Sequence, residues 1–334
     1  MGTSENPAAR ATIDDVARAA GVSRQTVSNV VRGRGRLGEA TRIRVLASIE
    51  QLGYEPHTAA ASLRSGRTYK IAYPVPDTEL RPDNGIMLEF LQFLVAAARR
   101  RDHQVLVTTS QPLDGIADLV RARSVDGFVL ATVADHDPRI GYLAEHQVPF
   151  ACFGRVDPPL PQHWVDIDNR AASHGVTELV LARGHVDIAF VGYTPQGRWD
   201  LEREAGYRDA MSAAGRPARV VHTPMGTDDA KTTVAALLGA PDRPAAVVAG
   251  SDVLAAACYA AAARMGLRIG PDLAVTGFDG SLVSRLLAPT LTTVLMPLPD
   301  IAARLVDRVI REVGGSPDGH GEIVDTTLVR GESV

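Results

Sequence analysis

Two short helical patterns near the N-terminus are separated only by a tight turn, and this spacing constrains the chain more than any other feature. The patterns cover residues 12–21 and 23–32. A joint this short prevents the two helices from lying antiparallel, so the second helix crosses the first steeply and projects outward. This geometry fits a helix into the major groove of DNA.

Local signals predict where these helices begin and end, and which residues they bury. Thr12 is predicted to cap the first helix with Asp15 in capping-box position, and Gly21 to end it in the left-handed conformation. Ser23 is predicted to cap the second helix. A third helix is predicted over roughly 39–51. The residues expected to face the core are Ile13, Val16, Ala17, Ala20, Val27, Val30, Val31, Ile43, Leu46 and Ile49.

Polar residues on the second pattern are expected to face outward. Arginine pairs two donors with guanine, and glutamine or asparagine pairs with adenine, so side chains of these types read base edges. A solvated face on a small three-helix bundle would carry the same residues, and this alternative stays open. The outward residues are Arg24, Gln25, Ser28 and Asn29.

Charge is divided unevenly along the chain. The net charge of −4 argues by itself against nucleic-acid binding. Residues 1–68, however, hold ten arginines and six acidic residues, giving +4, whereas the remainder holds 25 basic and 33 acidic residues, giving −8. A basic head on an acidic body is expected of a regulator that docks DNA at one end.

Cysteine usage and the terminal sequence indicate the compartment. Cys152 and Cys258 lie in apolar runs and are predicted to be buried free thiols, which suit a reducing environment. Residues 1–11 are expected to be a disordered leader without a signal-peptide core, and no apolar run reaches the length of a membrane span. We therefore expect a cytoplasmic protein with no membrane partner. No metal-ligand spacing is present, and no cofactor is expected.

From Lys70 onward, short apolar runs alternate with amphipathic helical patterns, and this alternation predicts parallel sheets covered by helices on both faces. The number of strands is too large for one open sheet and suggests two lobes. The predicted strands include Ile71–Val75, Gln104–Thr109, Gly127–Leu130, Phe150–Phe153, Asp187–Val191, Ala245–Ala249 and Leu273–Gly277. The predicted helices include Met87–Arg101, Asn169–Arg183, Arg203–Ala214 and Val253–Met265.

The run from residue 12 to residue 31, TIDDVARAAGVSRQTVSNVV, is followed by Thr41-Arg-x-x-Val and by Leu52-Gly-Tyr-x-Pro56. Together these motifs resemble the DNA-binding headpiece of the lactose/galactose-repressor (LacI/GalR) family. The resemblance implies an all-α helix-turn-helix domain over 12–56, followed by a hinge helix and linker over 57–68. Gly38 departs from the family pattern, because a serine or threonine commonly caps the third helix there.

The resemblance also implies roles for individual residues. It places Arg24, Gln25 and Asn29 at the base-reading positions, and Leu63 as a wedge in the minor groove. An apolar wedge kinks the duplex at a cost that added contacts repay. An ordinary linker contact is the alternative for Leu63. Candidate phosphate contacts are Thr12, Ser23, Thr26, Arg34, Arg36 and Tyr54.

The rest of the chain resembles the family's two-lobed, periplasmic-binding-protein-like α/β effector domain, here 69–334. The matching landmarks are Val165-Asp-Ile-Asp-Asn169, Arg183-Gly-His185, Arg203-Glu-Ala-Gly-Tyr207, Gly277-Phe-Asp279 and Leu291-Thr-Thr293. The resemblance implies a first lobe of about 70–166 plus 296–321, and a second of about 167–295 plus 322–334. The chain of such a domain crosses between the lobes three times, and the effector binds in the cleft.

Carried over by motif, Arg203 and Asp279 are the candidates for binding effector hydroxyls, since a guanidinium donates and a carboxylate accepts hydrogen bonds. Ser251 and Asp252 follow a predicted strand, where α/β proteins bind ligands, and Trp199 could stack on a sugar face. The alternatives are that Arg203 and Asp279 are ions that stabilise the lobes, and that Trp199 is a surface or lobe-packing aromatic residue. Gly154 stands where the family often has an acid, and Ser251 where it often has asparagine.

The sequence therefore predicts a homodimeric transcriptional regulator, expected to act as a repressor, that binds a palindromic DNA operator and responds to a small carbohydrate. One alternative is a corepressor-dependent regulator with a non-sugar ligand. The other is an enzyme or a ligand carrier on the same α/β body, although no nucleophile elbow, phosphate-binding loop or metal triad is present.

Overall fold

The computed structural model describes residues 11–31, 37–54, 67–75, 85–108, 113–156, 163–316 and 321–334. Arg34, Arg36, Leu63, the predicted hinge helix and all but the last residue of the predicted leader lie outside these residues. The chain divides into two compact units, Met1–Thr68 and Tyr69–Val334.

The first unit contains three helices, α1 (Ile13–Ala20), α2 (Arg24–Val31) and α3 (Glu39–Leu52). Local chemistry sets their ends as predicted. Thr12 and Asp15 form the capping box, and Gly21 is left-handed with φ 61°. Ser23 Oγ accepts the Thr26 N–H at 3.1 Å, and Gly53 ends α3 with φ 58°. As its sequence indicates, Gly38 caps α3 without a side-chain hydrogen bond.

The core of this unit confirms most predicted inward residues but not the predicted face of α3. The buried hydrophobic residues are Val16, Ala17, Ala20, Val27, Val30, Val45 and Tyr54, with Ile13 and Ile49 packed against them. Ile43 and Leu46 are 60% and 47% exposed, and Val31 is 38% exposed, so these three predictions are wrong. Apolar residues lie on several sides of α3, so their spacing alone selected the wrong face.

The second unit contains two six-stranded sheets. The first sheet has the order β11-β5-β4-β3-β1-β2 and is parallel throughout. Its strands are β1 (Lys70–Pro74), β2 (Gln104–Thr108), β3 (Gly127–Leu130), β4 (Phe150–Phe153), β5 (His163–Asp166) and β11 (Glu322–Ile323).

The second sheet has the order β12-β10-β9-β8-β6-β7. It is parallel except for β12, which runs antiparallel to β10. Its strands are β6 (Ile188–Tyr193), β7 (Arg219–Thr223), β8 (Ala246–Ala249), β9 (Ala274–Asp279), β10 (Thr292–Leu295) and β12 (Thr327–Val329).

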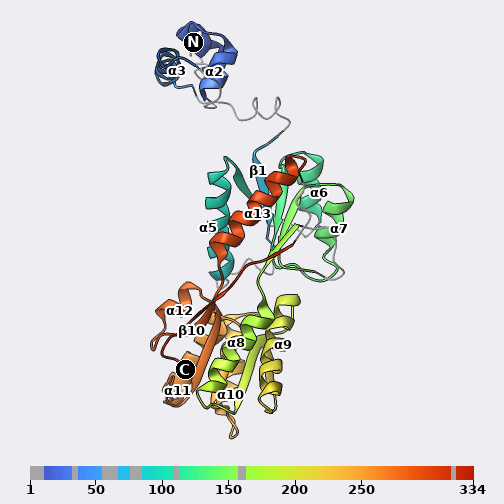
Figure 1. Ribbon diagram of the computed structural model, residues 1–334, viewed down its shortest axis with the longest axis vertical. Coiled ribbons are helices and arrows are strands. Elements are labelled where there is room, and N and C mark those ends of the chain that lie inside the picture. Colours follow the sequence, from blue (N-terminus) through green and yellow to red (C-terminus); the bar gives the residue numbers. More distant parts are fainter. Residues whose placement is uncertain are drawn as a thin grey trace, which may run out of the picture. The chain divides into compact units, whose positions relative to one another are not determined.

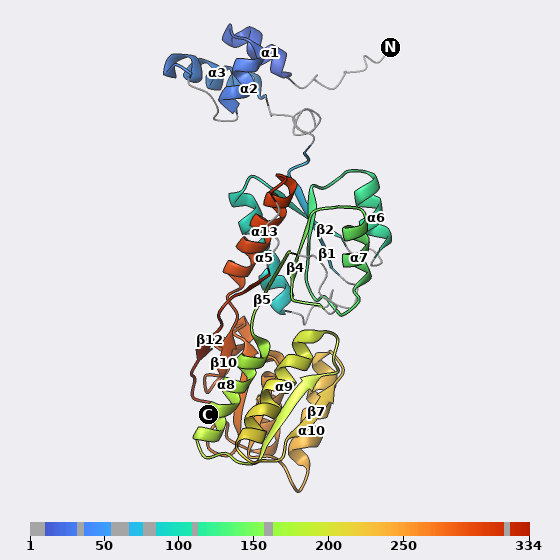
Figure 2. The same cartoon turned by 45° about the vertical axis from the view of Figure 1, so that its right-hand side comes forward.

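Helices cover both faces of each sheet, because successive strand residues point to opposite faces. Ile71 and Tyr73 join one core cluster, and Ala72 joins another. Figures 1 and 2 show α5 (Gly85–Arg100) and α13 (Leu298–Val313) beside the first sheet, with α6 (Asp114–Arg121) and α7 (Pro138–Glu145) across from them. The helices of the second lobe are α8 (Asn169–Ala182), α9 (Arg198–Ala213), α10 (Thr227–Gly239), α11 (Asp252–Met265) and α12 (Leu282–Leu286).

The chain passes from one sheet to the other three times, after β5, after β10 and after β11. The predicted lobe boundary at the last crossing is wrong. Glu322 and Ile323 pair with Val165 and Asp166 in the first sheet, so the crossing follows Ile323. This pair of residues is too short to give a sequence pattern.

Gly206 lets α8 and α9 approach closely. A Cβ atom at this position would overlap the backbone of Arg170 and His174 on α8. Only glycine fits there, so any larger residue would push α8 and α9 apart.

Candidate functional site

The outward surface of α2 carries three of the four predicted base-reading residues. Arg24 and Gln25 are exposed and Asn29 is partly exposed. Gln25 donates a hydrogen bond to Asn29 Oδ1 at 3.1 Å. Arg24 Nη1 lies 3.7 Å from Asp14 Oδ2, and both side chains are more than half exposed. An exposed ion pair of this kind contributes little stability, so the Arg24 guanidinium is available for another acceptor.

Ser28 does not belong to this surface, and its predicted outward position is wrong. The residue is only 7% exposed, because α2 is short and is packed by both other helices. Tyr54, a predicted phosphate contact, belongs to the core of this unit. Thr12 and Ser23 are exposed, and their hydroxyls take part in helix capping. Thr26 hydrogen bonds to Ser23 at 2.9 Å.

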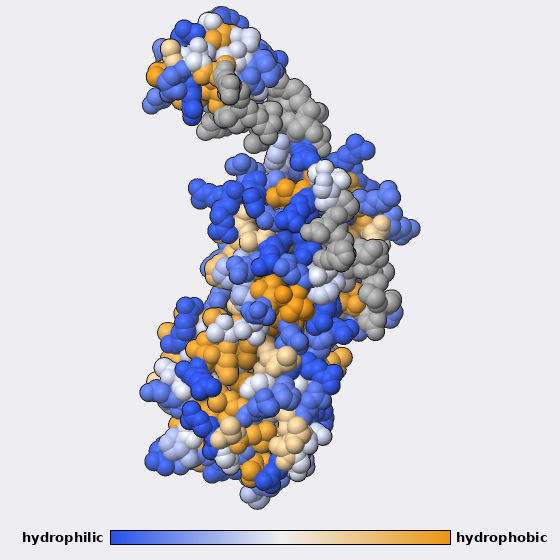
Figure 3. All heavy atoms as spheres, viewed as in Figure 1, coloured by the Kyte–Doolittle hydropathy of each residue, from blue (hydrophilic) through white to orange (hydrophobic). Residues whose placement is uncertain are grey.

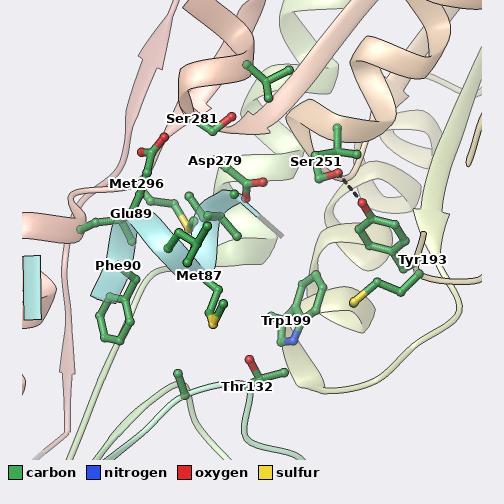
Figure 4. A pocket seen from close by; sticks show the side chains of 18 of the residues that line it. Met87, Glu89, Phe90, Thr132, Tyr193, Trp199, Ser251, Asp279, Ser281 and Met296 are labelled. Atoms are coloured by element: carbon green, nitrogen blue, oxygen red, sulfur yellow. Dashed lines mark hydrogen bonds between the residues drawn. The ribbon is translucent and has the colours of Figure 1, made fainter. Parts of the chain in front are cut away.

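The second unit contains a cavity of about 700 Å³ lined by residues of both lobes. Strand ends and helix starts of the two sheets meet there, as expected for ligand sites in parallel α/β folds. Figure 4 shows Asp279, Ser251 and Tyr193 together on one side, with Met87, Phe90 and Thr132 toward the other.

Arg203 lies at the centre of the polar side, 6% exposed. Its Nε donates to Asn169 Oδ1 at 2.9 Å, and its Nη1 donates to Gly250 O at 2.7 Å and to Asp279 Oδ1 at 3.3 Å. The guanidinium carbon lies 3.6 Å from the ring centroid of Phe278. Hydrogen bonds in the plane and an aromatic ring against the face therefore fix the guanidinium.

Asp279 ends β9 with φ 114°, a backbone conformation that L-residues rarely adopt. Burial raises the pKa of its carboxyl group to about 7, and the Asp252 carboxylate adds to the rise while Arg203 opposes it. A strained, buried carboxylate beside an arginine is a feature of ligand sites. The predicted pair of Arg203 and Asp279 is thus brought together in the cavity wall.

Asp252 is placed differently from its prediction, because it is fully buried and does not line the cavity. Its carboxylate accepts hydrogen bonds from Thr293 Oγ1 at 2.6 Å, Ser281 N at 2.7 Å and Ser281 Oγ at 2.9 Å. Burial raises its pKa to about 6. Asp252 therefore fixes the loop after Asp279 and is not positioned to touch an effector.

Ser251 does line the cavity. Its hydroxyl caps α11 by accepting the Leu254 N–H at 3.2 Å, and it shares a hydrogen bond with Tyr193 at 3.1 Å. Trp199 also lines the cavity, with its ring centroid 5.0 Å from the Arg203 guanidinium carbon. Trp199 thus faces the cavity and packs beside an arginine of its own helix, and its stacking on a sugar stays a prediction.

Several lining residues were not predicted. Asn169 lies within a motif that the sequence analysis identified, but its contact with Arg203 depends on a residue far away in the chain. Phe278, which is buried behind the lining, contacts Arg203 in the same way. The aromatic residues Tyr73, Phe90 and Phe153 come from the first lobe, where the apolar pattern predicted only core strands and a helix.

Two polar links join the lobes near the cavity. Arg155, between β4 and β5, donates to Glu202 of α9 at 2.9 Å. Glu89 of α5 accepts the backbone N–H of Leu282, at the start of α12, at 2.8 Å. Both links would have to adjust if the lobes moved.

Cys152 and Cys258 are buried free thiols, as predicted. Among the described residues, no group of three or more histidine, cysteine or acidic side chains has metal-site geometry. Within the same part of the chain, no helix has both the length and the apolar character needed to cross a membrane.

Comparisons with known proteins agree with both units. A family model for bacterial regulatory proteins of the lacI family matches residues 12–57, and one for periplasmic binding protein-like domains matches residues 177–334. The chain is 31% identical over 304 residues to the HTH-type transcriptional regulator DegA of Bacillus subtilis (strain 168), covering 88% of this chain and 89% of that relative.

Two solved structures are similar over nearly the whole chain. The transcriptional regulator CelR–cellobiose complex is 27% identical with a TM-score of 0.73, covering 97% of this chain and 100% of that one. The lac repressor dimer bound to operator and the anti-inducer ONPF has a TM-score of 0.82 at 22% identity, covering 97% and 99%. The second likeness shows the shared fold: a helix-turn-helix unit plus a two-sheet α/β domain.

Proposed function

This chain belongs to the LacI family of bacterial regulatory proteins, and from that premise we propose that it is a repressor. It binds a palindromic operator as a dimer and is controlled by a carbohydrate effector. Two features of this regulator carry the proposal: an outward polar surface on α2, and a cavity built around the Arg203–Asp279 pair.

Exposed apolar side chains on α5 and α12 support a dimer. The starts of these helices are joined by the Glu89–Leu282 hydrogen bond, and Figure 3 shows hydrophobic side chains at the surface over the lobe of the second sheet. Burying such a surface against a second copy is favourable. A symmetric pair would then present two reading helices to two half-sites. The exposed residues are Leu88, Val95, Leu282 and Leu286, of which Leu88, Leu282 and Leu286 also line the cavity.

Control by an effector follows from linkage between the lobes and DNA. The cavity is lined by both lobes, so an effector that favours one lobe arrangement changes how firmly a dimer holds its operator. A coupling of about 1–3 kcal/mol is typical. The cellobiose complex of CelR supports a carbohydrate as the effector class.

Selection of bound sequences from random DNA tests the operator proposal. We expect the wild type to return an inverted repeat with two equal half-sites. Arg24→Ala and Asn29→Ala should each relax the preference at one symmetric pair of positions, by about 1–3 kcal/mol per half-site, because each removes one base-edge contact.

Arg18→Ala is the matched control, since Arg18 is an exposed arginine of α1 paired with Asp15. It removes the same charge and should weaken all sequences equally while preserving the preference. Selection of no inverted repeat, or an unchanged preference in both reading-surface variants, would contradict the proposal.

The pH dependence of effector binding tests the role of Asp279. The ionised carboxylate is the form that accepts ligand hydroxyls, and its pKa is raised to about 7. Effector affinity should therefore rise about tenfold between about pH 6 and pH 8, as the group loses its proton. Isothermal titration calorimetry across this range measures the effect.

Asp279→Asn should bind weakly and lose this rise. Only a smaller change, at lower pH, should remain as Asp252 titrates, because its pKa is raised to about 6. An unaltered pH profile in the asparagine variant would mean that Asp279 does not contact the effector.

A further inference from the structure

The outward surface of α2 contains two amide side chains that are joined to each other. Gln25 and Asn29 lie four residues apart, which places them on one face of the helix. The Nε2 group of Gln25 donates a hydrogen bond to Asn29 Oδ1 at 3.1 Å. The family resemblance assigns both residues to base reading, but it does not imply this hydrogen bond. The bond determines what each amide can still offer to a base.

The neighbouring polar side chains of this surface have other partners. Ser23 and Thr26 share a hydrogen bond between their hydroxyl groups at 2.9 Å. Arg24 Nη1 lies 3.7 Å from Asp14 Oδ2, so the guanidinium is directed toward α1. Within the described part of the first unit, the two amides therefore form a unit of their own.

The hydrogen bond also fixes the direction of the Asn29 amide, with Oδ1 toward Gln25 and Nδ2 away from it. An amide oxygen has two lone pairs, so Oδ1 can accept a second hydrogen bond, and Nδ2 keeps both of its hydrogens. Asn29 is partly buried whereas Gln25 is exposed, and asparagine has one fewer rotatable bond than glutamine. Asn29 is thus the more rigid member of the pair.

An amide held in one direction matches the major-groove edge of adenine. Adenine presents an acceptor at N7 beside a donor at N6, so Nδ2 of an asparagine donates to the first while Oδ1 accepts from the second. Guanine presents two acceptors, N7 and O6, and its O6 would face the amide oxygen. An amide that could turn would instead direct Nδ2 to guanine O6. Discrimination between the two purines therefore requires that the amide of Asn29 stays fixed.

We propose that Gln25 and Asn29 act as one unit that reads a single A·T base pair in each operator half-site. Asn29 touches the adenine, and Gln25 is a positioning residue that holds the Asn29 amide in the reading direction. This inference rests on the proposed operator binding and adds the identity of one base pair. An amide that is already held in place loses less conformational freedom when DNA binds.

Selection from random DNA by the full-length protein gives the first test. The base-pair position that Asn29→Ala relaxes should be A·T in the sequences that the wild type selects. On duplexes of the selected sequence, exchange of this pair for G·C in both half-sites should weaken wild-type binding at least about tenfold. The same exchange should weaken binding by Asn29→Ala less than about threefold. Fluorescence anisotropy measures both losses.

Gln25→Met tests the positioning role. Methionine resembles glutamine in length and in helix propensity, but its side chain has no hydrogen to donate to Asn29 Oδ1. The variant should relax the same position as Asn29→Ala, to less than about threefold, with thermal unfolding unchanged because Gln25 is exposed. A variant with both changes should bind the selected duplex as Asn29→Ala does, within about twofold, because the second change removes no further base contact.

Arg24→Ala is the matched control on the same surface. Its guanidinium is directed toward Asp14 and is not part of the amide pair. Its loss should therefore relax a different base-pair position, and its effect should add to that of Asn29→Ala within about twofold.

The outcomes separate this inference from the proposed function. A wild type that selects no inverted repeat would overturn both. An inverted repeat in which Asn29→Ala relaxes a G·C position, or no position, would leave the operator in place and overturn the adenine assignment. If Gln25→Met relaxed a different position, or if its loss added to that of Asn29→Ala, Gln25 would read a base by itself. An unchanged preference in Gln25→Met would likewise overturn its positioning role.

Discussion

Replacing Arg203 by lysine should lower effector affinity by about 100-fold and leave operator affinity unchanged. Lysine keeps a positive charge beside Asp279 but cannot reproduce the donors to Asn169 and Gly250 or the contact with the Phe278 ring. A lysine held less firmly, and without the planar fork, cannot donate the same pair of hydrogen bonds to an effector, and the loss of two bonds from a charged donor costs about 3 kcal/mol or more. The measurements are calorimetry with a binding glycoside and fluorescence anisotropy with operator DNA.

Arg203→Lys is a sharper test than Arg203→Ala. Alanine would leave the buried Asp279 carboxylate without its cationic partner, and such a loss destabilises a fold by about 3–5 kcal/mol. Arg208→Lys is the matched control, because Arg208 lies on the same helix, is half exposed and pairs with Glu204. If Arg203→Lys lowered thermal stability severely but bound effector normally, Arg203 would be a structural ion of the lobe.

Replacing Val27 by aspartate should abolish specific operator binding, with a loss of at least about 100-fold, and leave effector affinity unchanged. Val27 is completely buried in a core of seven hydrophobic residues. An unpaired charge there costs about 3–5 kcal/mol, which is comparable with the entire stability of so small a unit. The effector cavity belongs to the other compact unit, so its folding does not depend on this core.

Ala47→Asp is the control that distinguishes unfolding of the first unit from the effect of an added negative charge. Ala47 is an exposed residue of α3, so its substitution adds the same negative charge without burying it. Long-range repulsion from DNA should weaken this control variant only modestly. Equal losses in the two variants would show that charge, and not the folded core, decides operator binding.

Sequence periodicity predicted the architecture well where strands are buried on both faces. Runs such as Gly127–Leu130 and Phe150–Phe153 are continuous and apolar, and the observed strands have these bounds. The strands β5 and β7 were missed because they contain His163, Asp166, Arg219 and His222 among their apolar residues. Edge and near-edge strands tolerate such residues, so their pattern is weak.

The predictions that failed for residues of the candidate sites have one physical cause in common. Capping signals act within four residues, and those for Thr12 and Ser23 were predicted correctly. The burial of Ser28, by contrast, depends on which face of α2 the other helices cover. The role of Asp252 depends on Thr293 and Ser281, which only the folded chain brings near. Contacts between residues so far apart in the chain leave no periodic signal.

The close approach of α8 and α9 at Gly206 has a consequence for signalling. Asn169 begins α8 and Arg203 lies on α9, so the close packing of these helices brings the guanidinium within hydrogen-bond distance of Asn169 without a ligand. A preorganised half-site spends little binding free energy on its own ordering. More of the free energy of ligand binding is then available to change the arrangement of the two lobes. A bulkier residue at position 206 would weaken the response to the effector, because it would separate α8 from α9 and displace the Arg203 guanidinium, even though it would touch no ligand.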